Sequence, residues 1–389
     1  MKDRVWKRID ELEPQLWDLA LRIHAHPELG FEEHQAAAWL AEALEGGGFR
    51  VERGAGGIPT AFRAIHPATK PGPRVALLAE YDALPELGHA CGHNLIAAIA
   101  VGAALGLAPV KKDLPGTLLV LGTPAEEGGG GKIKLIEAGL FRDLDAAMMV
   151  HPSDQTVVDR GSLAITEVGI EFHGVAAHAS SEPDKGVNAL DAVIQTFVGL
   201  NALRQHIRDG ARIHGVITHG GLKPNIVPEY AAARFYVRAS DNGYRDELVE
   251  KLRRCAEGAA LATGARLEFR LVGHAYKAIR PNRALAHAFA EHLAALGFPV
   301  EEPTGGVGST DMGDVSWEVP AIHPYIRIAD GTVPGHSRAF CEAARAEPAR
   351  AAMIAAAKAL AAVCLDLWTN PALMADVTRE FSEGQGTGS

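Results

Sequence analysis

Residues 74–100 read RVALLAEYDALPELGHACGHNLIAAIA, and they combine a short apolar run, a polar loop and the start of an apolar helix. The run at 74–81 is bounded by Pro73 and by a turn, which predicts a buried strand. Residues 95–108 are apolar on all sides, which is typical of a helix inside a core. The segment therefore predicts a strand–loop–helix unit with a polar loop.

The same alternation continues after this unit. Residues 117–127 and 146–151 are further apolar runs that predict buried strands, and residues 132–141 predict a helix between them. Apolar strands that alternate with helices are typical of a mainly parallel sheet covered on both faces. We therefore expect an α/β fold for this part of the chain.

The pattern changes near residue 165. Strand-like and helical segments then follow in the order β-α-β-β-α-β, which indicates a small antiparallel α+β module. Apolar helical patterns resume after residue 283. We expect one domain formed by residues 1–165 and 283–389, interrupted by a second domain at 166–282.

The composition narrows the class of protein. The chain has 389 residues and a formal net charge of −10, and this acidic balance argues against a nucleic-acid partner. We find no charge-free apolar stretch of transmembrane length and no signal-peptide pattern, so we expect no membrane partner. The four cysteines are far apart, without a CxxC pair, and we expect a cytoplasmic location.

Metal-ligand residue types follow the predicted strands of the first domain. These side chains are Asp82, Cys91, His93, Glu126, Glu127 and His151. Because ligands bind at the carboxyl ends of strands in open α/β sheets, we expect these side chains to converge. Thiolate, imidazole and carboxylate donors together suit Zn²⁺, Mn²⁺ or Co²⁺.

The adjacent carboxylates Glu126 and Glu127 suggest a division of labour. One can bind a metal ion, while the other remains free as a general base for a water molecule. Each residue alone has a simpler explanation: Cys91 as a buried apolar side chain, the glutamates as a solvated pair, and His151 as a turn residue. Their coincidence at successive strand ends favours a metal centre.

Five segments together resemble one known family. They are AEYDALPELGHACGHNLIA (79–97), GTPAEEGGGGKIKLIEAGLF (122–141), HGVAAHASSEPDKGVNALDAV (173–193), GSTDMGDVS (308–316) and GHSRAF (335–340). The chain resembles the M20 metallopeptidase/amidohydrolase family, and within it the D subfamily. The likeness is greatest to the branch that contains aminobenzoyl-glutamate hydrolase and peptidase M20 domain-containing protein 2.

The resemblance implies a catalytic domain with two divalent metal ions, Zn or Mn with Co also possible. It also implies an inserted lid that serves as the dimerisation domain of a homodimer. The metal ligands that it implies are Cys91 as a bridging ligand, His93, Glu127, His151 and His336. Glu80 stands where other branches of the family place a metal-binding histidine, which fits the D subfamily.

Further roles come from the same resemblance. It implies that Glu126 is the general base, that Asp82 orients a metal ligand and that His178 polarises the substrate carbonyl. The expected substrate-binding residues are Asn225, Arg238, Ser309 and Thr310. The planar guanidinium of Arg238 suits a carboxylate, which it can bind through two hydrogen bonds.

We therefore expect a metal-dependent hydrolase that cleaves the amide bond of N-acyl amino acids or dipeptides by a metal-activated water. One alternative keeps the fold and cleaves an aryl amide or another non-peptide C–N bond. The other alternative is a catalytically silent protein that binds a metal ion or a ligand. The presence of Glu126 and of every matched ligand argues against a silent protein.

Overall fold

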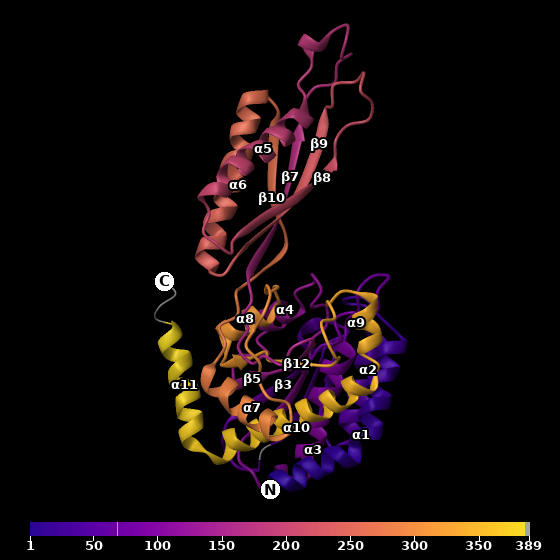
Figure 1. The fold of residues 1–389 in the computed structure, drawn as a ribbon, viewed down its shortest axis with the longest axis vertical. Coiled ribbons are helices and arrows are strands. Elements are labelled where there is room, and N and C mark those ends of the chain that lie inside the picture. Colours follow the sequence, from indigo (N-terminus) through magenta and orange to yellow (C-terminus); the bar gives the residue numbers. More distant parts are fainter. Residues whose placement is uncertain (68, 386–389) are drawn as a thin grey trace. The chain divides into compact units, whose positions relative to one another are not determined.

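The computed structural model describes residues 1–67 and 69–385, and the chain forms two compact units (Figure 1). Unit 1 contains Met1–Gly161, Ile279–Val307 and the chain from Asp311 onward. Unit 2 contains Ser162–Ala278 together with Gly308–Thr310.

Unit 1 is built on a six-stranded sheet whose central strands run parallel. Across the sheet, the strands are β1 (Arg50–Arg53), β2 (Phe62–His66), β4 (Thr117–Gly122), β3 (Arg74–Ala79), β5 (Ala146–Met148) and β11 (Ala321–Ile322). Pairing is parallel from β4 to β11 and antiparallel between β1, β2 and β4. The predicted α/β fold with a mainly parallel sheet is confirmed.

Helices cover both faces of this sheet. They are α1 (Lys2–Ala25), α2 (His34–Gly46), α3 (His93–Lys111), α4 (Gly131–Glu137), α7 (Arg283–Ala295), α8 (Met312–Glu318), α9 (Arg338–Ala343), α10 (Glu347–Thr369) and α11 (Pro371–Gln385), with a 3-10 turn at Ala55–Gly57. On β3, Val75 and Leu77 belong to the core shared with α1, α3 and α10, whereas Ala76 and Leu78 belong to the core shared with α4 and α8. Both faces of β3 are therefore apolar, and its charged residues follow the strand.

Helices α3 and α10 are long and apolar enough to span a membrane by length and composition, which the sequence analysis did not expect. In each helix, 83% of the most apolar window is buried inside the protein. The core helix of a soluble protein has the same properties, so these two helices are weak evidence for a membrane span.

The predicted strand at 146–151 is divided in two. Strand β5 ends at Met148, and β6 (His151–Ser153) pairs with β12 (Tyr325–Arg327) in a separate two-stranded sheet. His151 therefore begins a strand instead of ending one. The break turns the chain out of the main sheet at the point where its histidine is needed.

Unit 2 has the predicted order β-α-β-β-α-β. Its elements are β7 (Ala164–His173), α5 (Ala189–Leu203), β8 (Arg212–His219), β9 (Tyr230–Ala239), α6 (Asn242–Thr263) and β10 (Arg266–Tyr276), with 3-10 turns at Pro183–Lys185 and Arg204–His206. The sheet order is β10-β7-β9-β8 with antiparallel pairing throughout, and α5 and α6 share its apolar core. Asn188 and Asp241 begin the two helices by accepting backbone N–H groups on their side chains.

The bounds of unit 2 differ from the expected insertion at 166–282. Strand β7 already begins at Ala164, and the backbone N–H of Leu163 donates to the carbonyl of Gly308 over 2.7 Å. This bond joins a distant segment, Gly308–Thr310, to unit 2.

Two leucines on helix α6 allow a matched test of the unit 2 core. Leu248 is fully buried and Leu261 is 88% exposed. We expect Leu248→Ala to lower the free energy of unfolding by about 2–5 kcal/mol, because it leaves a cavity. Leu261→Ala should change it by less than about 0.5 kcal/mol. Chemical denaturation of both variants checks this, and equal losses would contradict the assigned core.

Candidate metal centre

Three overlapping groups of side chains in unit 1 place their ligand atoms within 4.8 Å of one another. The groups are Cys91, His93 and His151; Cys91, Glu127 and His336; and His93, Glu126 and Glu127. The structure thus brings together all five predicted metal ligands and the predicted general base. Their elements are the loop before α3, the turn after β4, the start of β6 and the segment before α9.

The histidine of the ACGH segment is held by Asp82. His93 is the first residue of α3, and its Nδ1 lies 3.0 Å from Oδ1 and 2.9 Å from the backbone carbonyl of Asp82. The Nε2 atom is buried and makes no hydrogen bond within the described residues. A histidine whose Nδ1 is held by a carboxylate presents Nε2 to a metal ion. Asp82 therefore lies where a residue that orients a ligand must lie.

Asp82 also contacts the second ligand-bearing segment. Its Oδ2 accepts the backbone N–H of Glu127 over 2.9 Å. The Glu127 carboxylate then lies 3.2 Å from Nε2 of His336, between Oε1 and the ring nitrogen. One buried carboxylate thus connects the ends of β3 and β4.

Cys91 and His151 approach each other through a close contact of their neighbours. Gly92 has a φ of 77°, and a Cβ atom there would lie 2.8 Å from Pro152. Glycine at this position lets the loop pack against the residue after His151. The Cys91 sulfur then lies 3.5 Å from Nε2 of His151, whose Nδ1 lies 2.7 Å from the Pro152 carbonyl.

The charges of the two histidines change the chemistry of Cys91. Burial alone would raise the pKa of its thiol, but positive charge on His151 and His93 outweighs burial and lowers this pKa to about 6. The thiolate is the form that binds metal ions. All four cysteines of the chain are free, so Cys91 is available as a ligand.

The neighbouring glutamates differ in their acidity. Burial raises the pKa of Glu126 well above its ordinary value, and the carboxylates of Glu80 and Glu127 raise it further. Burial acts on Glu127 in the same direction, but hydrogen bonding to His336 and the charge of His93 hold its pKa below the ordinary value. Two adjacent carboxyl groups with separated pKa values are suited to different roles, one as a proton carrier and one as a ligand.

The donor set fits divalent metal ions. Five carboxyl groups and one thiol lie near one another, namely Glu80, Asp82, Glu126, Glu127, Asp311 and Cys91. Burying this much negative charge is costly unless cations compensate it. Thiolate, imidazole and carboxylate ligands together suit Zn²⁺ or Mn²⁺.

Sequence reasoning missed three charged residues around this centre. Lys132 is fully buried against Glu80 and Asp311, and Glu33 accepts the backbone N–H of Ala125 over 2.8 Å. Ala125 has a φ of 57° and directly precedes the glutamate pair, so Glu33 fixes the turn that carries both. Asp311 directly follows the predicted Ser309 and Thr310, which was the available signal.

The remaining predicted residues lie in unit 2. The Nδ1 of the exposed His178 accepts the backbone N–H groups of Ser180 and Ser181 over 3.3 Å each. A neutral ring then carries its proton on Nε2, which is free to donate. The backbone N–H of Ala179 donates to the carbonyl of Asn225 over 3.0 Å, so the segments of His178 and Asn225 adjoin.

Arg238 and Ser309 form a second pair in unit 2. The Arg238 Nη1 atom donates to the Ser309 hydroxyl over 3.2 Å, and Thr310 is the next residue. The Arg238 Nε–H makes no hydrogen bond among the residues that the structure describes.

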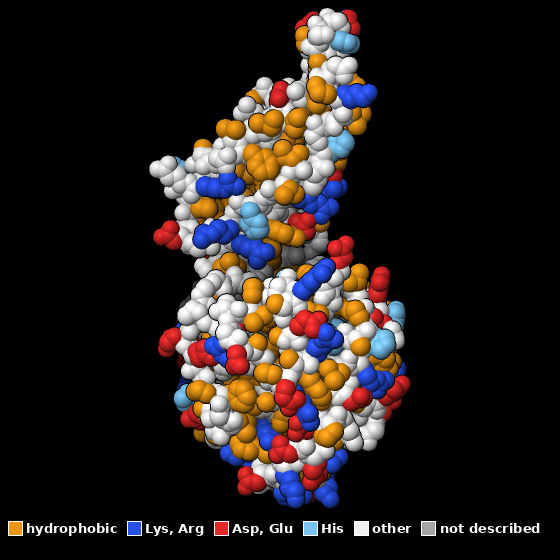
Figure 2. Space-filling model, turned by 45° about the vertical axis from the view of Figure 1, so that its right-hand side comes forward, with side chains coloured by type: hydrophobic (Ala, Val, Ile, Leu, Met, Phe, Trp, Pro, Cys, Tyr) orange, Lys and Arg blue, Asp and Glu red, His pale blue; other side chains and the backbone are white. Residues whose placement is uncertain are grey.

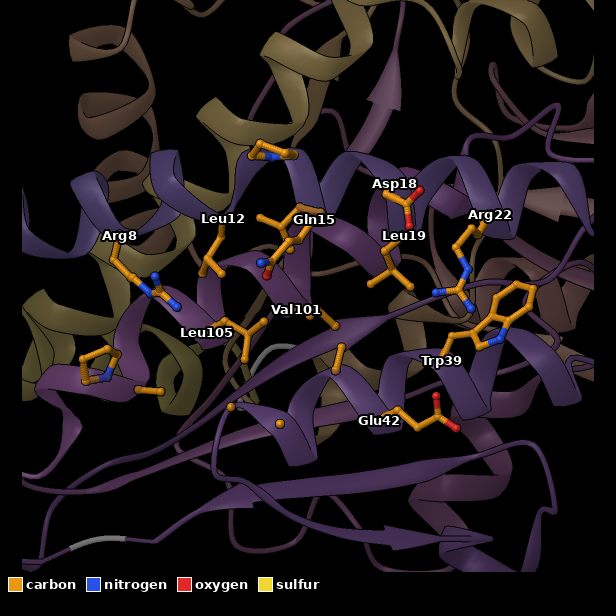
Figure 3. Close-up of a pocket in the computed structure, with 17 residues that line it drawn as sticks. Arg8, Leu12, Gln15, Asp18, Leu19, Arg22, Trp39, Glu42, Val101 and Leu105 are labelled. Atoms are coloured by element: carbon orange, nitrogen blue, oxygen red, sulfur yellow. The ribbon is translucent and has the colours of Figure 1, made fainter.

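A cavity of about 930 Å³ lies among α1, α2 and α3 (Figure 3). Its wall includes Leu12, Leu19 and Leu105, and the Arg22 guanidinium lies 4.5 Å from the centroid of the Trp39 ring. None of the metal-centre side chains lines it. The cavity and the metal centre are therefore separate features of unit 1.

The sequence was compared with known proteins. The family described as peptidase family M20/M25/M40 matches residues 76–363. Xaa-Arg dipeptidase of Mus musculus is 42% identical, over 98% of this chain and 92% of that protein. One of the component chains of p-aminobenzoyl-glutamate hydrolase from Escherichia coli (strain K12) is 32% identical, over 97% of this chain and 92% of that protein.

Solved structures share the fold. An aminobenzoyl-glutamate utilization protein from Klebsiella pneumoniae superposes with a TM-score of 0.74 at 24% identity, over 94% of this chain and 98% of that one. A dinuclear metal-binding peptidase of the M20 family from Bacillus subtilis gives a TM-score of 0.74 at 22% identity, over 92% and 99%. The chain therefore belongs to peptidase family M20/M25/M40, and it is a hydrolase of this metal-dependent family.

Proposed function

We propose that this enzyme hydrolyses the amide bond of N-acyl amino acids or dipeptides, with Glu126 as the general base. The observation that carries the proposal is the pair of adjacent glutamates with opposite pKa shifts beside a cluster of metal-ligand atoms. The relatives named Xaa-Arg dipeptidase and p-aminobenzoyl-glutamate hydrolase support amide substrates of this kind.

The chain's own residues supply the proton transfers. Two divalent ions held by Cys91, His93, Glu127, His151 and His336 would polarise the substrate carbonyl and lower the pKa of a water molecule. Glu126 takes a proton from the attacking water, because its raised pKa makes it a competent base near neutral pH. The same carboxylic acid then gives this proton to the departing amine.

Residues of unit 2 complete the proposed site. The Nε2–H of His178 donates to the oxygen of the tetrahedral intermediate, because its Nδ1 is already occupied by backbone N–H groups. Arg238 and Ser309, with Thr310 beside them, bind the substrate carboxylate, and Asn225 contacts the substrate near His178. Each of these roles requires unit 2 to close over the metal centre as a lid.

Aryl amides form the second candidate substrate class. The relative named p-aminobenzoyl-glutamate hydrolase favours it, whereas the Xaa-Arg dipeptidases favour dipeptides. A screen of the metal-loaded enzyme against dipeptides, N-acyl amino acids and p-aminobenzoyl-glutamate separates the two classes. Zn²⁺ and Mn²⁺ are the metals to load first, and Co²⁺ is a third choice.

We further propose a homodimer through unit 2. Ten of the thirteen exposed large apolar side chains lie in unit 2, and Figure 2 shows apolar side chains gathered on its visible face. Strands β8 and β10 are the two edges of its sheet. Edge β10 carries the charged side chains of Arg266, Glu268 and Arg270, whereas the middle of β8 is uncharged and exposes Val216 and Ile217. An uncharged edge strand is the one suited to pair with a second copy.

Replacement of the two glutamates tests their assigned roles. We expect Glu126→Gln to lower kcat by about 10²–10⁴-fold without loss of bound metal, because only the base is removed. Glu127→Gln is the matched neighbour and should lower metal content itself. Activity assays and elemental analysis of both purified variants give the result. Full activity of metal-loaded Glu126→Gln would overturn the mechanism.

Removal of the His178 imidazole tests the proposed oxyanion donor. We expect His178→Ala to lower kcat by about 10²–10³-fold with KM and metal content little changed, because the lost bond forms mainly in the transition state. The control is His206→Ala, another exposed histidine of unit 2, which should leave kcat unchanged. A rise in KM at constant kcat in the His178 variant would refute this role.

A charge placed on the β8 edge tests the dimer. We expect the double variant Val216→Lys, Ile217→Lys to be monomeric, because a lysine-bearing edge resists strand pairing. The control Val300→Lys carries the same type of substitution on unit 1 and should remain dimeric. Light scattering coupled to size-exclusion chromatography measures the mass of each. A monomeric unmodified protein, or a dimer that survives the β8 substitutions, contradicts the proposal.

A further inference from the structure

A buried ion-pair cluster lies beside the metal centre. The ammonium of Lys132 contacts Oε1 of Glu80 and lies 2.6 Å from Oδ1 of Asp311. The backbone N–H of Lys132 donates to Oδ2 of the same aspartate over 3.0 Å. All three residues are at most 1% exposed. The cluster joins the end of β3, the first turn of α4 and the start of α8.

The lysine remains charged in this environment. Burial alone would lower its pKa, but the carboxylates of Asp311, Glu80 and Glu126 raise it above the ordinary value. A buried ammonium is stable only when it is paired and hydrogen-bonded, and here two carboxylates meet it. Lys132 is thus a permanent positive charge within the acidic group that surrounds the metal ligands.

Glu80 is the member of the cluster that is nearest to a ligand atom. Its Oε2 lies 3.6 Å from Nε2 of His93, the nitrogen that faces the metal centre. By type and position, a carboxylate at this distance could bind a divalent ion. Its other oxygen, however, is held by Lys132.

We infer that Lys132 is a positioning residue: its ammonium retains Glu80 and Asp311 as an ion-paired counter-charge, so that Glu80 is not a metal ligand. The inference rests on the proposed two-metal centre. It limits the ligands to the thiolate, the three imidazoles and the single carboxylate of Glu127. The ammonium also offsets the two carboxylates that lie nearest to the general base.

Matched replacement of two glutamates tests the inference through metal binding alone. Glu80→Gln keeps an oxygen that can accept from Lys132, and we expect both ions to bind with affinities within about threefold of the unmodified enzyme. Glu127→Gln should weaken binding by about tenfold or more, the loss typical of a disturbed metal site. Competition with a chromogenic chelator measures Zn²⁺ affinity in each protein.

The outcomes of this experiment are distinguishable. A tenfold or greater loss of affinity in Glu80→Gln would make Glu80 a ligand and overturn the inference, while the proposed hydrolysis would stand. Failure of the unmodified protein to bind Zn²⁺, Mn²⁺ or Co²⁺ would overturn both proposals.

A second test removes the positive charge. In the Co²⁺-loaded protein, Lys132→Met frees Glu80, and we expect the visible absorption of the metal to change because the carboxylate can now bind it. The double variant Lys132→Met, Glu80→Gln should restore the original spectrum. A single variant with an unchanged spectrum, or a double variant that is not restored, would contradict the inference. If Lys132→Met does not fold, the Glu80→Gln measurement decides alone.

Discussion

The burial of negative charge beside the carboxyl ends of β3 and β4 is the constraint on which the rest of unit 1 depends. Glu80 and Asp82 follow β3, and Glu126 and Glu127 lie in the turn after β4. Both strands are apolar on their two faces, so charged groups have a place only beyond the strand ends. Carboxylates buried this closely need cations, and the chain offers histidines, one lysine and a set of atoms suited to metal ions.

Asp82 links this electrostatic requirement to geometry. Its carboxylate fixes the ring of His93 with one oxygen and the backbone of Glu127 with the other. The turn that carries Glu127 is held a second time, because Glu33 binds the N–H of Ala125. A left-handed residue next to a catalytic pair is maintained only where its surroundings determine it, and these two carboxylates do so. Side chains from four separate elements thus reach one small volume with little freedom left.

The sequence predicted those parts of the molecule that depend on local pattern. Strand β3 and helix α3 are uniformly apolar because they are buried on all sides, and the ligand residue types stood out against such segments. Lys132 was missed because a lysine in a glycine-rich segment before an amphipathic helix is typical of a solvated position. Its partner Asp311 is 179 residues away, and Glu33 is 92 residues from Ala125, so no local pattern reveals either contact. The return of Gly308–Thr310 to unit 2 is likewise a long-range pairing.

The central claim is that this chain is a hydrolase whose activity depends on two metal ions at the Cys91–His151 centre. The most direct measurement starts with protein freed of metal by a chelator and adds Zn²⁺ or Mn²⁺ stepwise while hydrolysis of a dipeptide or N-acyl amino acid is followed. The account predicts no activity before addition and a plateau at two equivalents per chain. Full hydrolytic activity in the metal-free protein would contradict it.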